Sequence, residues 1–232
     1  MHIMEGYLPA KDCLIWGAAS TPFVAAGVVH ARKVMREKRS VTLLLGAVGG
    51  FVFVLSSLKL PSVAGSSSHA TGIGLGAVLF GPLVMVLIGV IVLLFQALML
   101  QHGGLTTLGA NSFSMAIVGA LVAFGVYKIG RRVGWGIPFA AGVAAGTGDF
   151  ATYVTTSFQL ALAFQDGAGG FTAAMFKYLA IFAPTQLPLA IGEGVLTALV
   201  LGYLVKESPQ DLRDLGVLDT VATDVTLAGD AA

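Results

Sequence analysis

The sequence predicts an all-α membrane protein, a polytopic bundle of about seven transmembrane helices with the N-terminus outside and the C-terminus cytoplasmic. Two observations of composition and one of pattern predict this fold class. Of the 232 residues, 56% are hydrophobic and only 11% are charged, whereas soluble domains carry about 25% charged residues. The mean hydropathy is +0.88. The apolar residues form long stretches, and most of the basic residues lie between those stretches.

The hydrophobic stretches set the number of membrane crossings. A helix needs about 20 residues to cross the hydrocarbon core of a bilayer. The stretches cover approximately residues 13–30, 41–60, 71–101, 105–127, 136–165 and 172–205. The stretch 71–101 is long enough for more than one crossing, so the count depends on where it is interrupted.

Clusters of basic residues set the orientation. The linker 31–40 contains five basic residues in ten, which marks it as cytoplasmic and places the N-terminus and the loop 61–70 outside. A second basic cluster, 128–132, is expected on the cytoplasmic side as well. Reaching this cluster from the loop 61–70 takes an odd number of crossings. Since 105–127 supplies one crossing, 71–101 must supply two.

The stretch 71–101 is interrupted at Gly81 and Pro82, where proline removes a backbone donor and disfavours a continuous helix. We therefore expect a short, irregular segment at 71–81 and a full span at 83–101. A segment of 71–81 needs the preceding loop 61–70 to dip into the membrane, which is tolerable only if that loop is buried in protein. The alternative is six spans, with one basic cluster on the wrong side.

Charge divides the chain into two parts. Residues 1–205 form the expected membrane-embedded domain, whereas 206–232 holds six acidic residues against two basic ones and ends in small residues. We expect that second part to be a cytoplasmic, flexible tail. The start of the chain lacks the basic region of a signal peptide, so we expect Met1 to be the mature N-terminus.

Several function classes are excluded by composition and by absent motifs. The net charge of +1 gives no basis for a nucleic-acid partner, and the single cysteine, Cys13, excludes a disulfide framework or a CxxC motif. The sequence contains no GxxxxGK[ST] loop, no HExxH and no GxSxG. We therefore expect no ATP hydrolysis by this chain, no enzymatic activity and no organic cofactor.

The first two residues can chelate a transition metal. The Met1 amine and the His2 amide nitrogen close a five-membered ring on an ion, and the amide nitrogen and His2 Nδ1 close a six-membered ring. Together they present three nitrogens in one plane, and binding releases protons because the amide nitrogen must be deprotonated. A fourth nitrogen completes a square-planar site that suits Cu(II) and Ni(II). Low-spin Co(II) can adopt the same geometry.

His69 is the predicted fourth donor. It lies on the same outer side, in a loop rich in serine and glycine, where the hydroxyls of Ser67 and Ser68 can orient the imidazole or the backbone. His102 also lies outside, and the sequence leaves open whether it supports the site or only packs. His30, at the cytoplasmic end of the first span, is expected to be a packing residue.

Two acidic residues fall within predicted spans. Asp149 and Glu193 are costly at that depth and are therefore functional candidates, but a packing role paired with neighbouring hydroxyls is slightly favoured for both. No cationic partner for either is evident within the spans.

Four segments resemble the CbiM/NikM family, the substrate-capture (S) components of energy-coupling-factor transporters for cobalt and nickel. They are Met1 to Pro9 (MHIMEGYLP), Ser66 to Gly72 (SSSHATG), His102 to Asn111 (HGGLTTLGAN) and Gly148 to Tyr153 (GDFATY). The resemblance covers residues 1 to about 206. It implies a first helix added to a six-helix core, with the metal nitrogens supplied by Met1, His2 and His69. It also implies that the stretch from His102 to Asn111 lines or supports the site.

The resemblance further implies partners and a location. The partners would be a transmembrane coupling protein, a cytosolic ATPase dimer and a small accessory membrane protein in the bacterial inner membrane. ATP hydrolysis would then topple the S component and release Co²⁺ or Ni²⁺ inside, feeding cobalamin synthesis in the cobalt case. The sequence after residue 206 shows no fused accessory segment, which tilts the expectation towards cobalt.

Two other readings of the sequence remain. One is an autonomous, proton-coupled permease for divalent metals that uses Asp149 and Glu193. The other is a membrane-embedded enzyme or scaffold in which His2 and His69 are structural. Loss of metal uptake when the partner ATPase is disabled would support the S component and exclude the autonomous permease.

Overall fold

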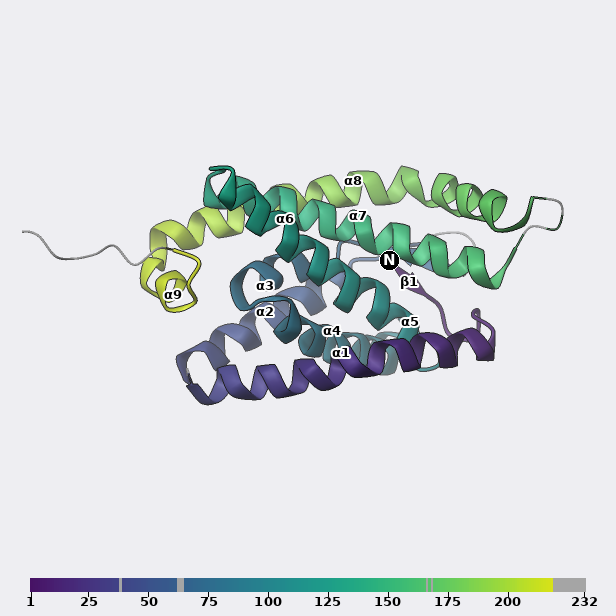
Figure 1. The fold of residues 1–232 in the computed structure, drawn as a ribbon, viewed down its shortest axis with the longest axis horizontal. Coiled ribbons are helices and arrows are strands. Elements are labelled where there is room, and N and C mark those ends of the chain that lie inside the picture. Colours follow the sequence, from purple (N-terminus) through teal and green to yellow (C-terminus); the bar gives the residue numbers. More distant parts are fainter. Residues whose placement is uncertain (38, 62–64, 166, 168, 219–232) are drawn as a thin grey trace, which may run out of the picture.

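A computed structural model describes residues 1–37, 39–61, 65–165, 167 and 169–218. The described chain is predominantly helical, and its long helices lie alongside one another (Figure 1). The helices are α1 Ala10–Glu37, α2 Arg39–Ser57, α3 Ile73–Phe80, α4 Pro82–Leu100, α5 Leu108–Asn111, the π-helical segment η1 Ser112–Gly119, α6 Ala120–Arg132, α7 Ile137–Ala163, α8 Gly170–Glu207 and α9 Pro209–Asp214. The strands are β1 His2–Ile3, β2 Leu60–Pro61 and β3 Ser66–Ser68. The all-α prediction is therefore confirmed, with one small sheet added.

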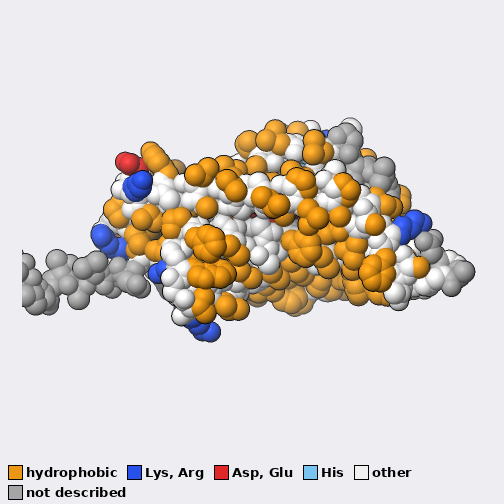
Figure 2. All heavy atoms as spheres, turned by 90° about the horizontal axis from the view of Figure 1, so that it is seen from above, with side chains coloured by type: hydrophobic (Ala, Val, Ile, Leu, Met, Phe, Trp, Pro, Cys, Tyr) orange, Lys and Arg blue, Asp and Glu red, His pale blue; other side chains and the backbone are white. Residues whose placement is uncertain are grey.

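The surface and the helix lengths fit a bilayer. Helices long and apolar enough to cross a membrane cover Ala10–Arg36, Pro82–Leu100, Leu108–Arg132 and Gly170–Glu207 in the described part of the chain. In Figure 2, hydrophobic side chains cover most of the visible face, and lysine and arginine side chains lie towards its two ends. Such a broad apolar surface is expected for a protein that faces lipid. The count of seven crossings and the side of each terminus stay predictions.

The predicted interruption at Gly81 and Pro82 is confirmed. Helix α3 ends at Phe80, Gly81 adopts a φ of 84°, and α4 begins at Pro82. All eight residues of α3 are buried. At about 1.5 Å per residue, α3 spans only about 12 Å, so it crosses little of a bilayer by itself. The following α4, with 19 residues, matches the full span expected at 83–101.

The loop before α3 is buried, as the short helix requires. Residues 66–70 are buried, and β3 pairs antiparallel with β1 on one side and β2 on the other. The registers place His2 opposite Ser67 and Leu60 opposite Ser68. Backbone groups buried away from water need partners. The small sheet, which the sequence did not predict, supplies them.

Helices α7 and α8 pack closely because their contact faces carry glycine. A Cβ at Gly142 would lie 2.7 Å from the carbonyl oxygen of Gly194, and one at Gly146 would lie 2.9 Å from that of Ala190. Small residues let helix backbones approach in this way. The close contact holds together the two helices that carry Asp149 and Glu193.

The end of the chain corrects one expectation. The sequence predicted a flexible tail from residue 206, yet Pro209–Asp214 forms α9, and Leu212 and Val217 are buried against the helical body. The physical reason is that these apolar side chains find a hydrophobic surface which local charge counting cannot detect. The remainder of the predicted tail, 219–232, lies outside the described residues.

Candidate metal centre

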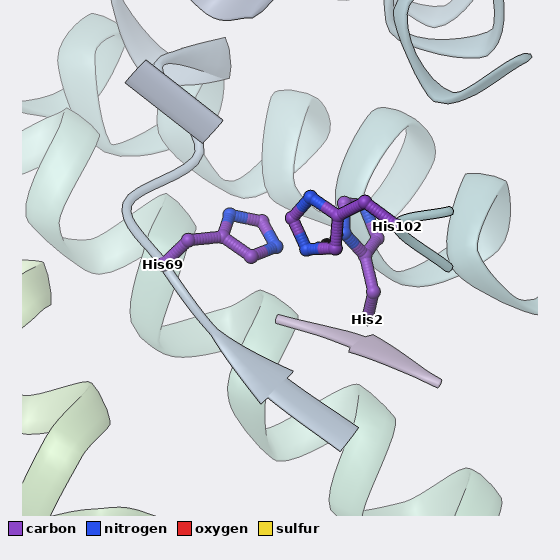
Figure 3. A group of neighbouring side chains, drawn as sticks. All are labelled: His2, His69 and His102. Carbon is purple, nitrogen blue, oxygen red and sulfur yellow. Dashed lines mark hydrogen bonds between the residues drawn. The ribbon is translucent and has the colours of Figure 1, made fainter. Parts of the chain in front are cut away.

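Three imidazoles meet inside the helical bundle, from segments far apart in the sequence. His2 comes from β1, His69 follows β3, and His102 follows α4, and their rings face one another in Figure 3. One ring nitrogen from each residue lies within 4.8 Å of the others, and all three side chains are buried. The structure thus brings together His2 and His69, as predicted, and adds His102, which the sequence had left open. His30, in contrast, is exposed on α1.

The N-terminal segment reaches this position because two loops hold it on opposite sides. The Met4 amide donates to the carbonyl oxygen of Gly65 over 2.9 Å, and the Glu5 amide donates to that of Gly103 over 3.0 Å. The Glu5 carboxylate accepts hydrogen bonds from the amide and hydroxyl of Thr106. The segment is therefore fixed by its backbone as well as by its side chains.

The Asn111 side chain makes two hydrogen bonds to the backbone of Ile3. Its Oδ1 accepts from the Ile3 amide over 2.8 Å, and its Nδ2 donates to the Ile3 carbonyl oxygen over 3.0 Å. The Thr107 hydroxyl donates to the same carbonyl oxygen over 2.9 Å. Both polar groups of the buried Asn111 side chain therefore have hydrogen-bond partners. Met1 and His2 directly precede Ile3, so these bonds also fix where the two residues lie.

His69 presents a free nitrogen to the cluster. Its Nδ1 lies 2.8 Å from the carbonyl oxygen of Ala70, which can only accept, so Nδ1 carries the proton and donates it. Its Nε2 therefore has a lone pair, and this atom is buried with no hydrogen-bond partner in the described part of the chain. A backbone carbonyl that fixes one imidazole nitrogen is the usual way of orienting the other towards a metal.

His2 and His102 are held by a short chain of contacts. His2 Nδ1 lies 3.1 Å from His102 Nε2, and Ser67 Oγ lies 2.8 Å from the same His102 nitrogen. The remaining ring nitrogens, His2 Nε2 and His102 Nδ1, are buried without a hydrogen-bond partner among the described residues. The Ser67 hydroxyl therefore contacts one of the three imidazoles, and its role in orienting the metal donors stays a prediction.

Ser68 has a different neighbour. Its hydroxyl lies 2.8 Å from the Thr185 hydroxyl, so it ties β3 to α8 instead of orienting an imidazole. The alternation of side chains along a strand explains the difference, because adjacent residues point to opposite faces.

Glu193 fixes the loop that follows His69. Its carboxylate accepts hydrogen bonds from the Thr71 amide and, over 2.9 Å, from the Thr71 hydroxyl. This contact between α8 and the start of α3 was not predicted, because Thr71 and Glu193 are separated by 122 positions. An acid at the start of a helix is also favoured by the backbone dipoles there.

Asp149 has no such partner. It is 1% exposed, and neither carboxylate oxygen makes a hydrogen bond to any residue that the structure describes. Asp149 interacts electrostatically with the Met1 amine, which carries a positive charge when it is protonated. The amine also interacts electrostatically with Glu193. The sequence did not indicate this interaction, because the amine comes from the start of the chain and not from within the spans.

Burial keeps the nitrogens of this centre neutral. It lowers the pKa of the Met1 amine from 8.0 to about 6, and this effect outweighs the opposing pull of Asp149 and Glu193. Burial also lowers the pKa values of His2 and His69 well below 6.5, and that of His102 to about 3. Neutral amines and imidazoles are the forms that coordinate metal ions.

Comparison with known proteins places the chain in a family. Residues 2–210 match the sequence profile of the CbiM family, described as the cobalt uptake substrate-specific transmembrane region. The chain is 57% identical over 204 residues to the cobalt transport protein CbiM of Thermosediminibacter oceani, covering 88% of this chain and 84% of the relative. It is 55% identical over 222 residues to the CbiM protein of Streptomyces coelicolor, covering 95% of each.

Solved structures agree with this placement. A transition metal transporter superposes with a TM-score of 0.78 at 27% identity, over 94% of this chain and 100% of that chain. A truncated transition metal transporter superposes with a TM-score of 0.76 at 29% identity, over 89% and 99% respectively. The chain therefore belongs to the CbiM family, the substrate-specific transmembrane components of cobalt uptake.

Proposed function

We propose that this chain is the S component of an energy-coupling-factor transporter, and that it captures Co²⁺ for ATP-driven uptake. The chain is a multi-pass membrane transport component of the bacterial inner membrane and not an enzyme. The names of its relatives favour Co²⁺ as the transported ion. Ni²⁺ fits the same nitrogen donors and is the alternative cargo.

The observation that carries this proposal is the burial of the N-terminus beside His2 and His69. Met1, His2 and His69 are each fully buried, and His69 Nε2 has a lone pair with no hydrogen-bond partner in the described part of the chain. The Met1 amine, the His2 amide nitrogen and His2 Nδ1 would form the two fused chelate rings. His69 Nε2 would then complete a planar set of four nitrogens.

The surrounding residues would position these donors. Asn111 holds Ile3 and therefore the chelating residues that precede it. In the structure His2 Nδ1 faces His102 Nε2 at 3.1 Å, so the captured ion would replace that contact. We assign to His102 and Ser67 the role of holding the His2 imidazole in place while the site is empty.

Energy for uptake would come from separate proteins. The sequence has no phosphate-binding loop of the GxxxxGK[ST] type, so ATP hydrolysis requires partners. We assign these roles to a transmembrane coupling protein, a cytosolic ATPase dimer and a small accessory membrane protein. The imported cobalt would supply cobalamin synthesis.

A proton-coupled permease is the alternative function, and it rests on the two buried acids. The contacts argue against it, because the Glu193 carboxylate is bound by Thr71 and Asp149 lies in electrostatic reach of the Met1 amine. Both acids therefore belong to the architecture of the capture site. A proton pathway would need them to connect to water on each side in turn.

Uptake of radioactive Co²⁺ into cells that express this chain with its partner proteins tests the proposal. Substituting the phosphate-binding lysine of the partner ATPase should abolish accumulation, while binding of Co²⁺ by the chain is retained. Accumulation that persists with the disabled ATPase and is abolished by an uncoupler would support the permease instead. The matched control is His30→Ala, which alters an exposed histidine and should leave uptake unchanged.

A further inference from the structure

We propose that Asp149 is the counter-charge of the capture site, facing the Met1 amine in the empty chain and accepting a hydrogen bond from it when the ion is bound. This inference rests on the proposed function, since it assumes that the amine is a metal donor. It assigns to Asp149 a positioning role and not a place among the metal ligands.

The Asp149 carboxylate has unused hydrogen-bonding capacity in a buried position. Asp149 is buried, and both of its oxygens lack a hydrogen-bond partner among the residues that the structure describes. Burying an ionised carboxylate without partners is costly, and such groups normally pair with a cation or a metal. Each buried group left unsatisfied in a folded protein calls for a specific explanation.

The hydroxyls near Asp149 do not provide that explanation. Thr147 donates to the carbonyl oxygen of Val143, and Thr152 donates to that of Gly148. The Tyr153 hydroxyl donates to the carbonyl oxygen of Leu179 on α8. The pairing that the sequence allowed between Asp149 and these hydroxyls is therefore absent from the described contacts.

Met1 lies among buried residues of α7 and α8. Met1 belongs to a buried cluster that includes Tyr153 and Leu160 of α7 and Phe182 of α8. Tyr153 is one helical turn after Asp149, and residues four apart lie on the same helix face. The N-terminal residue therefore belongs to the same buried cluster as the face of α7 that carries the carboxylate. The electrostatic interaction between the amine and Asp149 agrees with this placement.

The contrast with Glu193 separates the two acids. The Glu193 carboxylate is bound by the amide and hydroxyl of Thr71, so it serves the loop that carries His69. Asp149 makes no comparable hydrogen bond to any residue that the structure describes. Its carboxylate is left to interact with whatever positive charge enters the site.

The bound ion and its four nitrogen donors together carry a net positive charge. A divalent ion bound by one deprotonated amide nitrogen and three neutral nitrogens retains one positive charge, and a single carboxylate neutralises it. In a buried, weakly polar environment this compensation is worth far more than in water. A coordinated amine also keeps N–H groups, which can donate charge-assisted hydrogen bonds to the carboxylate.

The test compares the full-length wild type with Asp149→Asn and Ser157→Ala in detergent. Calorimetric titration with Co²⁺ measures the affinity of each, and the absorption of the Ni²⁺-bound form reports on the four nitrogens. Asp149→Asn keeps the shape and removes the charge, and we expect it to weaken Co²⁺ binding by tenfold or more. At saturating Ni²⁺ it should keep the wild-type visible absorption, because the four nitrogens are unchanged. Ser157→Ala, a buried neutral change two turns further along α7, should bind Co²⁺ as the wild type does.

Two results overturn the inference: wild-type affinity in Asp149→Asn, or an altered Ni²⁺ spectrum at saturation, which would show that the residue only shapes the fold. If the Asn variant does not fold, Asp149→Glu replaces it. Because the charge is retained, its affinity should stay within tenfold of wild type, and a folded Glu variant without binding would contradict the proposal.

A chain with one extra glycine ahead of Met1 separates this inference from the proposed function. If the extended chain still binds Co²⁺ tightly, the amine is not a donor, and the proposed capture site itself is wrong. If the extension abolishes binding while Asp149→Asn binds normally, only the role of Asp149 is wrong.

Discussion

His69 illustrates how a single residue can be assigned by its two nitrogens. The carbonyl oxygen of Ala70 accepts a hydrogen bond from the protonated Nδ1, and Nε2 is left buried without a hydrogen-bond partner in the described structure. The sequence suggested His69 from its loop composition and from its predicted position on the same side of the membrane as His2. The structure adds the tautomer, which makes Nε2 the nitrogen that faces an incoming ion.

Substituting His69→Ala should therefore weaken Co²⁺ binding by about a hundredfold or more, since loss of even a supporting contact costs a metal site about 10–100-fold. Calorimetric titration of the purified chain measures this loss. His30→Ala is the matched histidine control and should bind normally, because His30 is exposed on α1. Equal Co²⁺ affinities of the two variants would show that His69 is not a metal ligand.

Asn111 should be needed for binding although it contacts no donor atom. Asn111→Ala would leave the amide of the buried Ile3 without its partner, at a cost of about 1–3 kcal/mol. The N-terminal segment would then leave its place more often, and the apparent affinity would fall by up to the factor that this cost corresponds to, about 5- to 150-fold. Hydrogen exchange at Ile3 should rise in parallel, whereas unchanged exchange would contradict this role.

At the scale of elements, the loop between α4 and α5 fits the N-terminal segment because two of its residues, Gly103 and Gly104, have no side chain. A Cβ at Gly104 would lie 2.6 Å from the Cα of Glu5, a backbone atom that cannot move aside cheaply. Gly103, with a φ of 77°, adopts a conformation that favours glycine. The pair of glycines therefore lets the loop close directly over residues 2–6.

Gly104→Ala should push the loop away from the N-terminal segment and weaken Co²⁺ binding by tenfold or more, since the donors lose their support. The control is Gly50→Ala on α2, where a Cβ would meet no atom within 4 Å. Titration of both variants, with thermal unfolding to check the fold, decides the matter. Wild-type binding by Gly104→Ala would mean that the loop does not hold the segment.

The elements that could be predicted are those set by neighbouring residues. The hydrophobic stretches and the Gly81–Pro82 break follow from local composition, and the structure confirms the break. The sheet of β1, β3 and β2 could not be predicted, because two- and three-residue strands carry no periodicity. Helix α9 was missed for a related reason, since Leu212 is buried only by contact with distant helices.

At the scale of the whole molecule, the fold buries the N-terminal residues in the interior of the protein. Figure 1 shows the N-terminus between α1 on one side and α7 and α8 on the other. The sequence identified Met1, His2 and His69 as candidate donors from chelate chemistry. It could not reveal that Asp149 interacts with the Met1 amine or that His102 joins the imidazoles, because these contacts join segments about 100 or more residues apart.

Binding should strengthen as the pH rises, because capture of the ion releases protons. The buried Met1 amine has a pKa of about 6, so above that pH only the His2 amide proton must leave. The affinity should then rise about tenfold per pH unit above pH 6 and about a hundredfold per unit below it, where the amine proton leaves as well. Titrations from pH 5 to 8 measure the slope, and a flat profile would exclude amide coordination.

The central claim is that the free N-terminus of this chain is itself a metal ligand. The most direct measurement is a calorimetric titration with Co²⁺, and separately with Ni²⁺, of the chain with its native N-terminus and of a chain with one extra residue ahead of Met1. The account predicts tight one-to-one binding that the extra residue destroys, because it moves the amine out of the chelate ring. Equal affinity of the two chains would contradict the account and turn attention to a site built from the three imidazoles alone.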